Sequence, residues 1–459
     1  MTLIKSISGI RGTIGNLPNF NLTPLDIVRF TSAYAMWLKG KAEGRLTVVT
    51  GRDARISGPM VHSLVNNTLV GMGIDVIDLG LSTTPTVAIS VPMENANGGI
   101  IITASHNPKK WNALKLLNEA GEFIDSNAGS KIIGLAETEK FSYAEIDNLG
   151  TISENSNYLD KHINATVSLK YVNKIDIKKA KFKVVVDGVN SSGGVIIPKL
   201  LEALDVEVVK IHCNPNGDFP HNPEPLKENL RDLCEAVVIN KADFGIAVDP
   251  DVDRLVFVDE KGKSFGEEYT LVACADFILS KKIGPTVSNL SSTRALADIT
   301  NKLGGSFTSS AVGEVNVVIE MKRVGAIIGG EGNGGIIYPE IHYGRDALVG
   351  VALFLSLLVE RKKSVSDIRA SYPSYFMSKN KIILKKEVDI AQIFKTIKRK
   401  YRNNNMSTVD GLKIDFSEEW IHLRKSNTEP IIRVITEAKT QVSADDLAKK
   451  FINEIKQLF

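Results

Sequence analysis

The feature that most constrains the fold is a repeated alternation of short apolar runs with segments of helical periodicity. Residues 45–53 and 74–80 are rich in β-branched residues, and residues 58–73 between them place apolar side chains at helical spacing before a glycine. Strands that are apolar along nearly their whole length belong to parallel or mixed sheets that helices cover on both faces. We therefore predict an α/β fold.

The alternation occurs three times and then changes character. It restarts at residues 181–194 and continues to residues 243–258, and a third set begins with the helical residues 266–282 and ends in a long helix at residues 344–363. From residue 379 a basic helix, two strands and a last helix predict a smaller α+β domain. A chain of 459 residues is too long for one core. We predict three α/β domains with mixed sheets and a C-terminal α+β domain, at residues 1–155, 156–262, 263–374 and 375–459.

The composition limits the classes of partner that this chain can bind. The net charge of +3 comes from 56 basic and 53 acidic residues, so we expect no nucleic-acid partner. The N-terminus lacks the apolar core of a signal peptide, and the longest apolar run, residues 349–359, is about half a membrane span. We therefore expect a cytoplasmic protein without a membrane partner. The chain has three cysteines, Cys213, Cys234 and Cys274. We expect them to be packing residues and neither disulfide partners nor zinc ligands.

The stretch "ITASHNP" places Ser105 directly after an apolar run. Serine, asparagine and proline after a strand are also typical of an ordinary turn, so this stretch alone does not establish a nucleophile. A functional hydroxyl needs a partner, and His106 and Lys115 are the nearby candidates.

The stretch "DPDVDR" supplies three carboxylates at alternate positions, Asp249, Asp251 and Asp253. In an extended segment these side chains would share one face, and such crowding favours a hard divalent cation such as Mg²⁺. A solvated acidic turn is the plain alternative. A calcium-binding EF-hand is a stronger alternative to the Mg²⁺ site, because Glu260 lies at the twelfth position of such a loop. However, Arg254 occupies the sixth position, where an EF-hand loop needs glycine.

The stretch "GGEGNGG" contains the GxGxxG spacing of dinucleotide sites, but strand-forming residues follow it where such a site needs a helix. A turn between two strands is the alternative interpretation. The glycines also leave room for Glu331 and Asn333 to hydrogen-bond a polyol.

The stretch "LRKSNTEPIIRV" supplies a guanidinium, two hydroxyls and an amide in one short loop. Such donors suit a dianionic phosphate, although an ordinary polar loop can have the same composition. Its candidate phosphate ligands are Arg424, Ser426, Asn427 and Thr428, while Arg433 either joins them or pairs with Glu429.

Taken together, these four stretches resemble the α-D-phosphohexomutase family, in the order of its phosphoserine, metal, sugar and phosphate loops. The stretches that carry the resemblance are "TASHNP", "DPDVDR", "GEGNGG" and "RKSNTEPIIR", with weaker matches in "SGIRG" at residues 8–12 and "GRDARIS" at residues 51–57. The resemblance spans nearly the whole chain. It implies four domains arranged around a central cleft and a reversible phosphoryl shift between O1 and O6 of a hexose phosphate.

The resemblance also implies a role for each candidate. Ser105 would carry the phosphoryl group, Asp249, Asp251 and Asp253 would hold Mg²⁺ together with it, and Arg254 would neutralise charge. Glu331 and Asn333 would bind sugar hydroxyls, and the last loop would bind the second phosphate. Lys115 and His106 match positions for proton transfer or phosphate contact, with Lys115 the better proton-transfer candidate, and Arg11 would lie near the active centre. A hexose 1,6-bisphosphate would be intermediate and activator.

Substrate preference follows less directly from the resemblance. Asn333 and Gly335 depart from the serine and histidine that are common in the sugar loop, and Asn427 is commoner in phosphomannomutases. The residues around both loops favour glucosamine phosphate. The alternatives are a dual-specificity phosphomannomutase/phosphoglucomutase and a non-catalytic phosphosugar-binding relative, which would need neither nucleophile nor aspartates. We expect a monomer or a homodimer.

Overall fold

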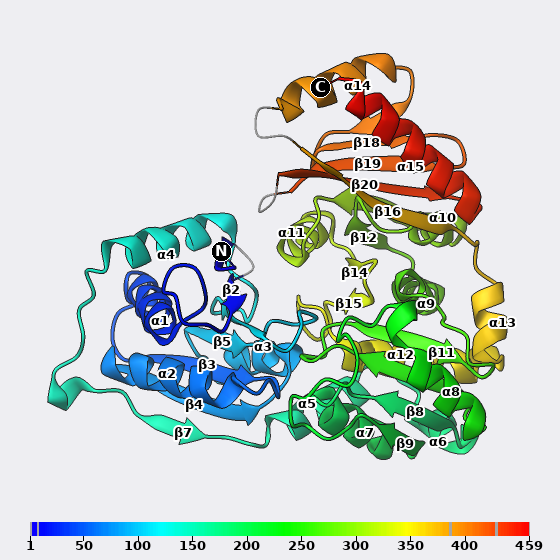
Figure 1. Cartoon of the computed structure of the whole chain (residues 1–459). Helices are drawn as coiled ribbons and strands as arrows, with labels where there is room; N and C mark the ends of the chain where they lie inside the picture. The colour runs from blue at the N-terminus through cyan, green and yellow to red at the C-terminus, as the bar shows by residue number, and fades with distance from the viewer. Residues whose placement is uncertain (1, 7–8, 385–387, 427–429, 459) are drawn as a thin grey trace.

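The computed structural model describes residues 2–6, 9–384, 388–426 and 430–458. In this part of the chain the strands form four sheets, three of them mixed and the last antiparallel. Figure 1 shows the first unit beside the second and third, with the C-terminal unit next to the third. The predicted fold class is therefore confirmed. The predicted boundaries near residues 155, 262 and 374 stay predictions.

The first sheet has the order β1-β2-β6-β5-β3-β4-β7. Its central strands β5, β3 and β4 are parallel, and β6 and β2 continue the sheet in antiparallel pairing. The strands are β1 (Ile4–Ser6), β2 (Gly9–Thr13), β3 (Leu46–Arg52), β4 (Ile74–Leu81), β5 (Gly98–Ile102), β6 (Trp111–Leu117) and β7 (Ile152–Glu154). The helices are α1 (Pro24–Lys39), α2 (Gly58–Gly71), α3 (Thr84–Met93) and α4 (Ser126–Thr138), and a 3-10 turn, η1, spans Ile146–Asn148.

The second sheet has the order β11-β10-β8-β9, in which β10, β8 and β9 are parallel and β11 is an antiparallel edge. Its strands are β8 (Lys183–Asp187), β9 (Glu207–Ile211), β10 (Phe244–Val248) and β11 (Leu255–Asp259). The helices of this unit are α5 (Tyr158–Val167), α6 (Lys174–Ala180), α7 (Gly193–Ala203) and α8 (Arg231–Ile239), with a 3-10 turn, η2, at Lys227–Asn229.

The third sheet repeats this plan in the order β13-β12-β14-β15, with β15 as the antiparallel edge. Its strands are β12 (Pro285–Asn289), β13 (Ser306–Ser310), β14 (Ile328–Glu331) and β15 (Gly335–Ile337). Its helices are α9 (Glu267–Lys281), α10 (Ala295–Lys302), α11 (Glu314–Val324), α12 (Ala347–Arg361) and α13 (Val365–Ala370).

Helix α12 joins the second and third units. Its residues from Ala347 to Leu358 are all buried, because apolar side chains surround the helix on every side. Phe354 of α12 stacks on Phe257 of β11 at 3.8 Å between ring centroids and meets Phe244 of β10 edge-on at 5.8 Å. The second and third units therefore share one hydrophobic core, which fixes the metal loop relative to the sugar loop.

The C-terminal sheet has the order β16-β20-β19-β18-β17 and is antiparallel throughout. The α+β domain expected here is present. Its strands are β16 (Phe376–Ile383), β17 (Asn405–Ser407), β18 (Leu412–Asp415), β19 (Trp420–Lys425) and β20 (Ile431–Ala438), and its helices are α14 (Ile390–Lys400) and α15 (Gln441–Lys456). Across the described residues we find no helix with the length and apolarity that a bilayer span requires.

Two apolar segments are each interrupted by a loop that carries predicted site residues. Residues 243–258 form β10 and β11, which pair antiparallel around the loop of Asp249 to Arg254. Residues 325–338 likewise form β14 and β15 around Gly332 to Gly334. Both loops therefore lie at the turn of a hairpin.

Candidate active site

Ser105 lies in the loop that follows β5, and its surroundings orient the hydroxyl. The residue is 3% exposed and its backbone is left-handed, with φ at 48°, which is rare for a residue with a side chain. Its amide donates to Oγ1 of Thr103 at 2.9 Å, and its own Oγ donates to Oδ2 of Asp249 at 2.6 Å. The predicted nucleophile of the first unit therefore contacts the predicted metal loop of the second.

Arg55 holds this loop in place. Its guanidinium is fully buried, pairs with Asp53 at 3.0 Å, and Asp53 in turn accepts a hydrogen bond from Thr103 at 2.6 Å. The other guanidinium hydrogens donate to the loop carbonyls of Ser105, Asn107, Pro108 and Trp111. Sequence reasoning noted residues 51–57 but gave Arg55 no role, because the carbonyls that it binds carry no sequence signal.

Asp249, Asp251 and Asp253 are each 0% exposed, and one carboxylate oxygen from each lies within 4.8 Å of the others. They converge because the chain turns between β10 and β11, with Val252 in a left-handed conformation at φ 64°. The three carboxylates converge as predicted. The predicted cause, alternation along an extended strand, is wrong.

Three cations, one of them Arg254 at 4.0 Å from Oδ1 of Asp253, only partly balance the triad. Nζ of Lys115 donates to Asp251 at 2.6 Å and to Asp253 at 3.3 Å, and a guanidinium nitrogen of Arg345 donates to Asp253 at 2.7 Å. Oδ1 of Asp251 and Oδ1 of Asp253 are buried and accept no hydrogen bond from the described residues. Buried carboxylate oxygens without partners are costly, so the donor set fits a hard divalent cation.

The charges at this site shift the pKa values of several groups. Burial, with the neighbouring carboxylates of Asp253 and Asp251, raises the pKa of Asp249 well above its usual range. Burial by itself would lower the pKa of Lys115, but Asp251 and Asp253 outweigh it and raise the pKa. Burial, with Arg254 and Arg11, lowers the pKa of His106 to about 2. Lys115 is therefore an ammonium and His106 a neutral imidazole at neutral pH.

Arg345 connects the metal loop to the sugar loop. Its guanidinium donates to Asp253 at 2.7 Å, to Glu331 at 2.9 Å and to Glu314 at 2.9 Å, and the residue is 8% exposed. Arg345 lies in the segment between β15 and α12. It directly precedes Asp346, which is the N-cap of α12. Sequence reasoning missed Arg345 and Glu314, since nothing in their spacing shows that they meet.

The sugar loop is held by hydrogen bonds to neighbouring segments and within the loop itself. Glu331 is 5% exposed, and its Oε1 accepts hydrogen bonds from Asn289 at 2.9 Å and from the amide of Gly313 at 3.0 Å. Oδ1 of Asn333 accepts from the amide of Gly335 at 3.1 Å. Strand β15 follows this loop, which excludes the helix that a GxGxxG dinucleotide site needs.

The phosphate loop lies at the end of β19. Arg424 stands opposite Arg433 of β20, and Arg433 stands opposite Lys381 of β16, so three cations occupy one row of the sheet. One carboxylate, Asp410, pairs with Arg424 at 2.7 Å. Ser426 is 7% exposed. Like charges directly opposite each other repel, so this row suits an anionic ligand. Asn427 and Thr428 lie outside the described residues.

One cleft of about 550 Å³ brings side chains of all four units together. Arg11 donates to Asn107 of the phosphoserine loop at 3.0 Å, and Arg254 donates to Glu224 at 2.9 Å. The predicted site residues that line the cleft are Arg11, Ser105, His106, Lys115, Arg254, Glu331 and Arg424, and Glu314 and Arg345 join them.

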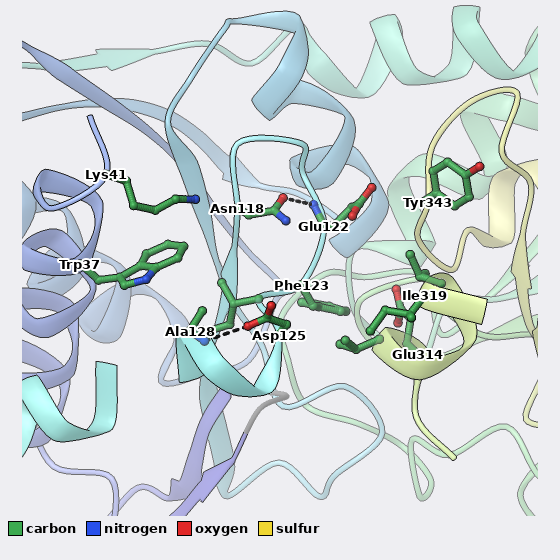
Figure 2. A pocket seen from close by; sticks show the side chains of 13 residues that line it. Trp37, Lys41, Asn118, Glu122, Phe123, Asp125, Ala128, Glu314, Ile319 and Tyr343 are labelled. Carbon is green, nitrogen blue, oxygen red and sulfur yellow. Dashed lines mark hydrogen bonds between the residues drawn. The ribbon is translucent and has the colours of Figure 1, made fainter. Parts of the chain in front are cut away.

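A second pocket of about 230 Å³ adjoins this cleft. Figure 2 shows Trp37 of α1 and Lys41, which follows that helix, on one side of it, and Ile319 and Tyr343 of the third unit on the other. Phe123 lines both the pocket and the cleft. Nearby, Nζ of Lys322 pairs with Glu122 at 2.5 Å. This ion pair ties the first unit to the third.

Glu268 is a carboxyl beneath the sugar loop, and its side chain is 12% exposed. A Cβ atom on Gly332 would lie 1.8 Å from its Oε2, so any side chain at position 332 would require this carboxylate to move. The amide of Thr293 donates to the same oxygen at 2.9 Å, and Lys379 lies 4.0 Å away. Burial raises the pKa of Glu268 to about 8, although Lys379 opposes this shift.

The raised pKa of Glu268 predicts a loss of stability as pH rises. Its folded pKa of about 8 lies above the ordinary value of 4.5. Between these two pKa values the folded state holds a proton that the unfolded chain releases. The free energy of unfolding therefore falls by about 1.4 kcal/mol for each pH unit in this range. We expect Glu268→Gln to flatten the fall in melting temperature between about pH 5 and about pH 8. The exposed Glu235→Gln is the control, and parallel profiles for wild type and Glu268→Gln would contradict the assignment.

Comparison with known proteins shows which family the chain resembles. Sequence models of the phosphoglucomutase/phosphomannomutase alpha/beta/alpha domains I, II and III match residues 4–143, 157–262 and 266–375, and the C-terminal domain model matches residues 378–454. A phosphoglucomutase/phosphomannomutase of Thermococcus kodakarensis is 33% identical over 95% of this chain and 94% of the relative. A probable phosphoglucosamine mutase of Methanopyrus kandleri is 30% identical over 98% of this chain and 97% of the relative.

The chain belongs to the phosphoglucomutase/phosphomannomutase family. Members of this family are phosphohexomutases, which are intramolecular phosphotransferases of the isomerase class, and so is this chain. Among solved structures, a family protein of Burkholderia thailandensis has a TM-score of 0.84 and 24% identity, and the match covers 100% of this chain and 98% of that one. That likeness shows the same four-domain fold.

Proposed function

We propose that this phosphohexomutase carries its phosphoryl group on Ser105 and interconverts hexose 6-phosphate and hexose 1-phosphate through a 1,6-bisphosphate. The observation that carries the proposal is the 2.6 Å hydrogen bond from Ser105 to Asp249 across two units of the fold. A serine that contacts a fully buried acidic triad within a cationic cleft suits phosphoryl transfer, since the nucleophile and the charge that stabilises the transferred group lie together.

The residues that would hold Mg²⁺ are Asp249, Asp251 and Asp253, with Ser105 in its phosphorylated form. The ion, when bound, supplies positive charge that polarises the phosphoryl oxygens and stabilises the transition state. The two buried triad oxygens without partners support this assignment. Arg254 lines the cleft beside Ser105 and supplies further positive charge to the transferring group.

Lys115 is our candidate for the proton transfers. As the bond between phosphorus and Oγ of Ser105 breaks, the ammonium gives a proton to Oγ. As the substrate hydroxyl forms its new bond to phosphorus, the resulting amine accepts the hydroxyl proton, so protons and bonds balance. Neutral His106, whose Nδ1 lies 3.4 Å from Oγ of Ser105, is placed to contact the phosphoryl group.

The bisphosphate must turn round before its other phosphoryl group can return to Ser105. Arg424 and Ser426, with Asn427 and Thr428, are our candidates for holding the phosphate that is not reacting. The row of cations that Arg424 shares with Arg433 supports this role. Glu331 and Asn333 are our candidates for binding sugar hydroxyls in both orientations. A hexose 1,6-bisphosphate added from solution would activate the dephosphorylated protein.

We propose glucosamine 6-phosphate as the preferred substrate. Relatives named as probable phosphoglucosamine mutases, such as those of Methanopyrus kandleri and Pyrococcus abyssi, support this choice. Glu314 and Glu331 line the cleft, and their carboxylates suit an amino sugar. The Thermococcus relative named for glucose and mannose phosphates favours dual specificity as the second candidate.

We expect kcat/KM for glucosamine phosphate to exceed the values for glucose and mannose phosphates by at least about tenfold, because one charged contact contributes about 1.4 kcal/mol or more. The measurement compares the three 1-phosphates, each with a trace of its 1,6-bisphosphate. Equal values, or a preference for mannose phosphate, would replace the substrate while leaving the chemistry intact.

Asp251→Asn tests the metal assignment. We expect Mg²⁺-dependent turnover to fall about a thousandfold, because the variant loses one charged ligand of the ion. Activity is followed during titration of Mg²⁺ into chelator-treated protein. Asp367→Asn, on the exposed first turn of α13, controls for loss of a carboxylate elsewhere. Full activity of wild type after thorough chelation would refute the assignment.

A further inference from the structure

A second group of metal-ligand side chains lies in the second unit, apart from the aspartate triad. Asp187, His212 and His221 each offer one oxygen or nitrogen atom, and these three atoms lie within 4.8 Å of one another. The proposed phosphoryl transfer uses none of them. We propose that they form a binding site for a divalent transition-metal ion such as Zn²⁺.

The fold brings these residues to one edge of the second sheet. Asp187 is the last residue of β8, and its parallel partner in β9 is Ile211, which directly precedes His212. His221 lies at the other end of the loop that begins at His212. Parallel neighbouring strands end at the same edge of a sheet, so the aspartate and the first histidine meet without any special loop geometry.

The hydrogen bonds of His221 point to a cation at its other nitrogen. Nδ1 of His221 lies 2.9 Å from the carbonyl oxygen of Asn222, which only accepts hydrogen bonds, so Nδ1 carries the proton. Nε2 of His221 then faces Oδ2 of Asp187 at 3.0 Å. In a neutral ring this would place two acceptors against each other. Either a proton on Nε2, which makes an ion pair with Asp187, or a metal ion in its place removes this conflict, and metal-bound histidines commonly donate their other N–H to a carbonyl in this way.

The other two ligands have supporting contacts as well. Nε2 of His212 lies 3.1 Å from a carboxylate oxygen of Asp232, and Oδ1 of Asp187 accepts from the amide of Val189 at 3.0 Å. The rings of His212 and His221 lie edge to face at 5.6 Å between centroids. Asp187 is 1% exposed, whereas the side chains of His212 and His221 are 23% and 18% exposed. An ion can therefore enter from solvent and meet a buried carboxylate.

The ligand chemistry separates this site from the triad. Two imidazoles and one carboxylate match the ligand types of open zinc sites, in which water takes a fourth position. Mg²⁺ prefers oxygen ligands alone, and nitrogen ligands favour the later first-row divalent ions. The two sites can therefore hold different ions in the same chain.

A metal at this position would close the base of the loop from His212 to His221. Residues of this loop contact the phosphoserine loop and Arg55, the side chain that holds the phosphoserine loop in place. Asp218 pairs with Lys109 at 3.0 Å, and the ring of Phe219 lies 5.1 Å beneath the guanidinium of Arg55. The ion would thus stabilise the surface against which the loop of Ser105 packs.

The test uses the full-length protein with excess Mg²⁺, which occupies the triad. Titration with Zn²⁺, followed by calorimetry, and with Co²⁺, followed by its visible absorption, should give one ion per chain. His212→Gln and His221→Gln should each weaken binding at least about tenfold and remove the rise in melting temperature that Zn²⁺ gives the wild type. Asp218→Asn, an exposed carboxylate of the same loop, and Asp251→Asn, in the triad, should both bind as wild type does.

Three results would overturn the proposal. The first is an absence of saturable binding by the wild type. The second is unchanged affinity in both histidine variants, and the third is loss of binding in Asp251→Asn, which would assign the ion to the triad. Circular dichroism verifies that each variant is folded. Because both histidine side chains are partly exposed, at least one of these variants should fold and decide the outcome.

Discussion

Ser105→Ala should reduce turnover by at least about 10⁴-fold, because no other hydroxyl replaces a covalent nucleophile. Protein purified from cells should carry one phosphoryl group on Ser105, visible in the intact mass and by peptide sequencing, and the variant should carry none. Substrate should still bind to the variant, since Arg424 and Glu331 are unchanged. The loss therefore belongs in kcat and not in KM.

The control for this variant is Ser130→Ala, which removes a hydroxyl from the exposed face of α4 and should leave turnover unchanged. Hydrogen exchange or a thermal melt shows that Ser105→Ala is folded. Turnover within about tenfold of wild type would eliminate Ser105 as the phosphate carrier. A phosphoryl group on some other residue of the active protein would do the same.

Arg345→Met should produce the largest loss of stability among the site variants. Removing the guanidinium leaves Glu314 and Glu331 without their cation and takes from Asp253 its shorter cationic contact, and breaking a buried ion pair in this way costs about 3–5 kcal/mol. The metal loop and the sugar loop also lose the side chain that joins them. We expect a fall in the free energy of unfolding of that size and at least about a hundredfold loss in kcat/KM.

Two variants make this result specific to Arg345. Arg345→Lys keeps the charge but not the three separate donor directions, so it should recover part of the stability and little of the activity. Arg323→Met removes an exposed arginine that pairs with Glu320 and should change the free energy of unfolding by less than about 1 kcal/mol. Wild-type stability in Arg345→Met would contradict the bridging role.

The chemistry of this site was more predictable from sequence than its geometry. Ser105 and the three aspartates lie in contiguous stretches whose residue types limit what they can do, so the sequence alone singled them out as candidates. The left-handed conformations at Ser105 and Val252 were not predictable, because neither residue type favours that region. The turn at Val252, and not strand periodicity, is what brings the carboxylates together.

The positioning residues were least predictable. Arg55 and Arg345 act on groups distant in sequence, and a buried arginine in a single sequence looks like an exposed one. The alternation of apolar runs indicated three units correctly. It did not indicate that α12 would be buried on every side and join two of them, since an apolar helix is compatible with either sheet.

Transfer of a labelled phosphoryl group tests the central claim most directly. Protein labelled with radioactive phosphate on Ser105 is mixed with unlabelled glucosamine 6-phosphate and stopped at successive times. We predict that label leaves the protein, appears first in the sugar 1,6-bisphosphate and then in both monophosphates, as fast as steady-state turnover requires. Label that stays on Ser105 while substrate is converted, or that appears as free phosphate, would contradict the account.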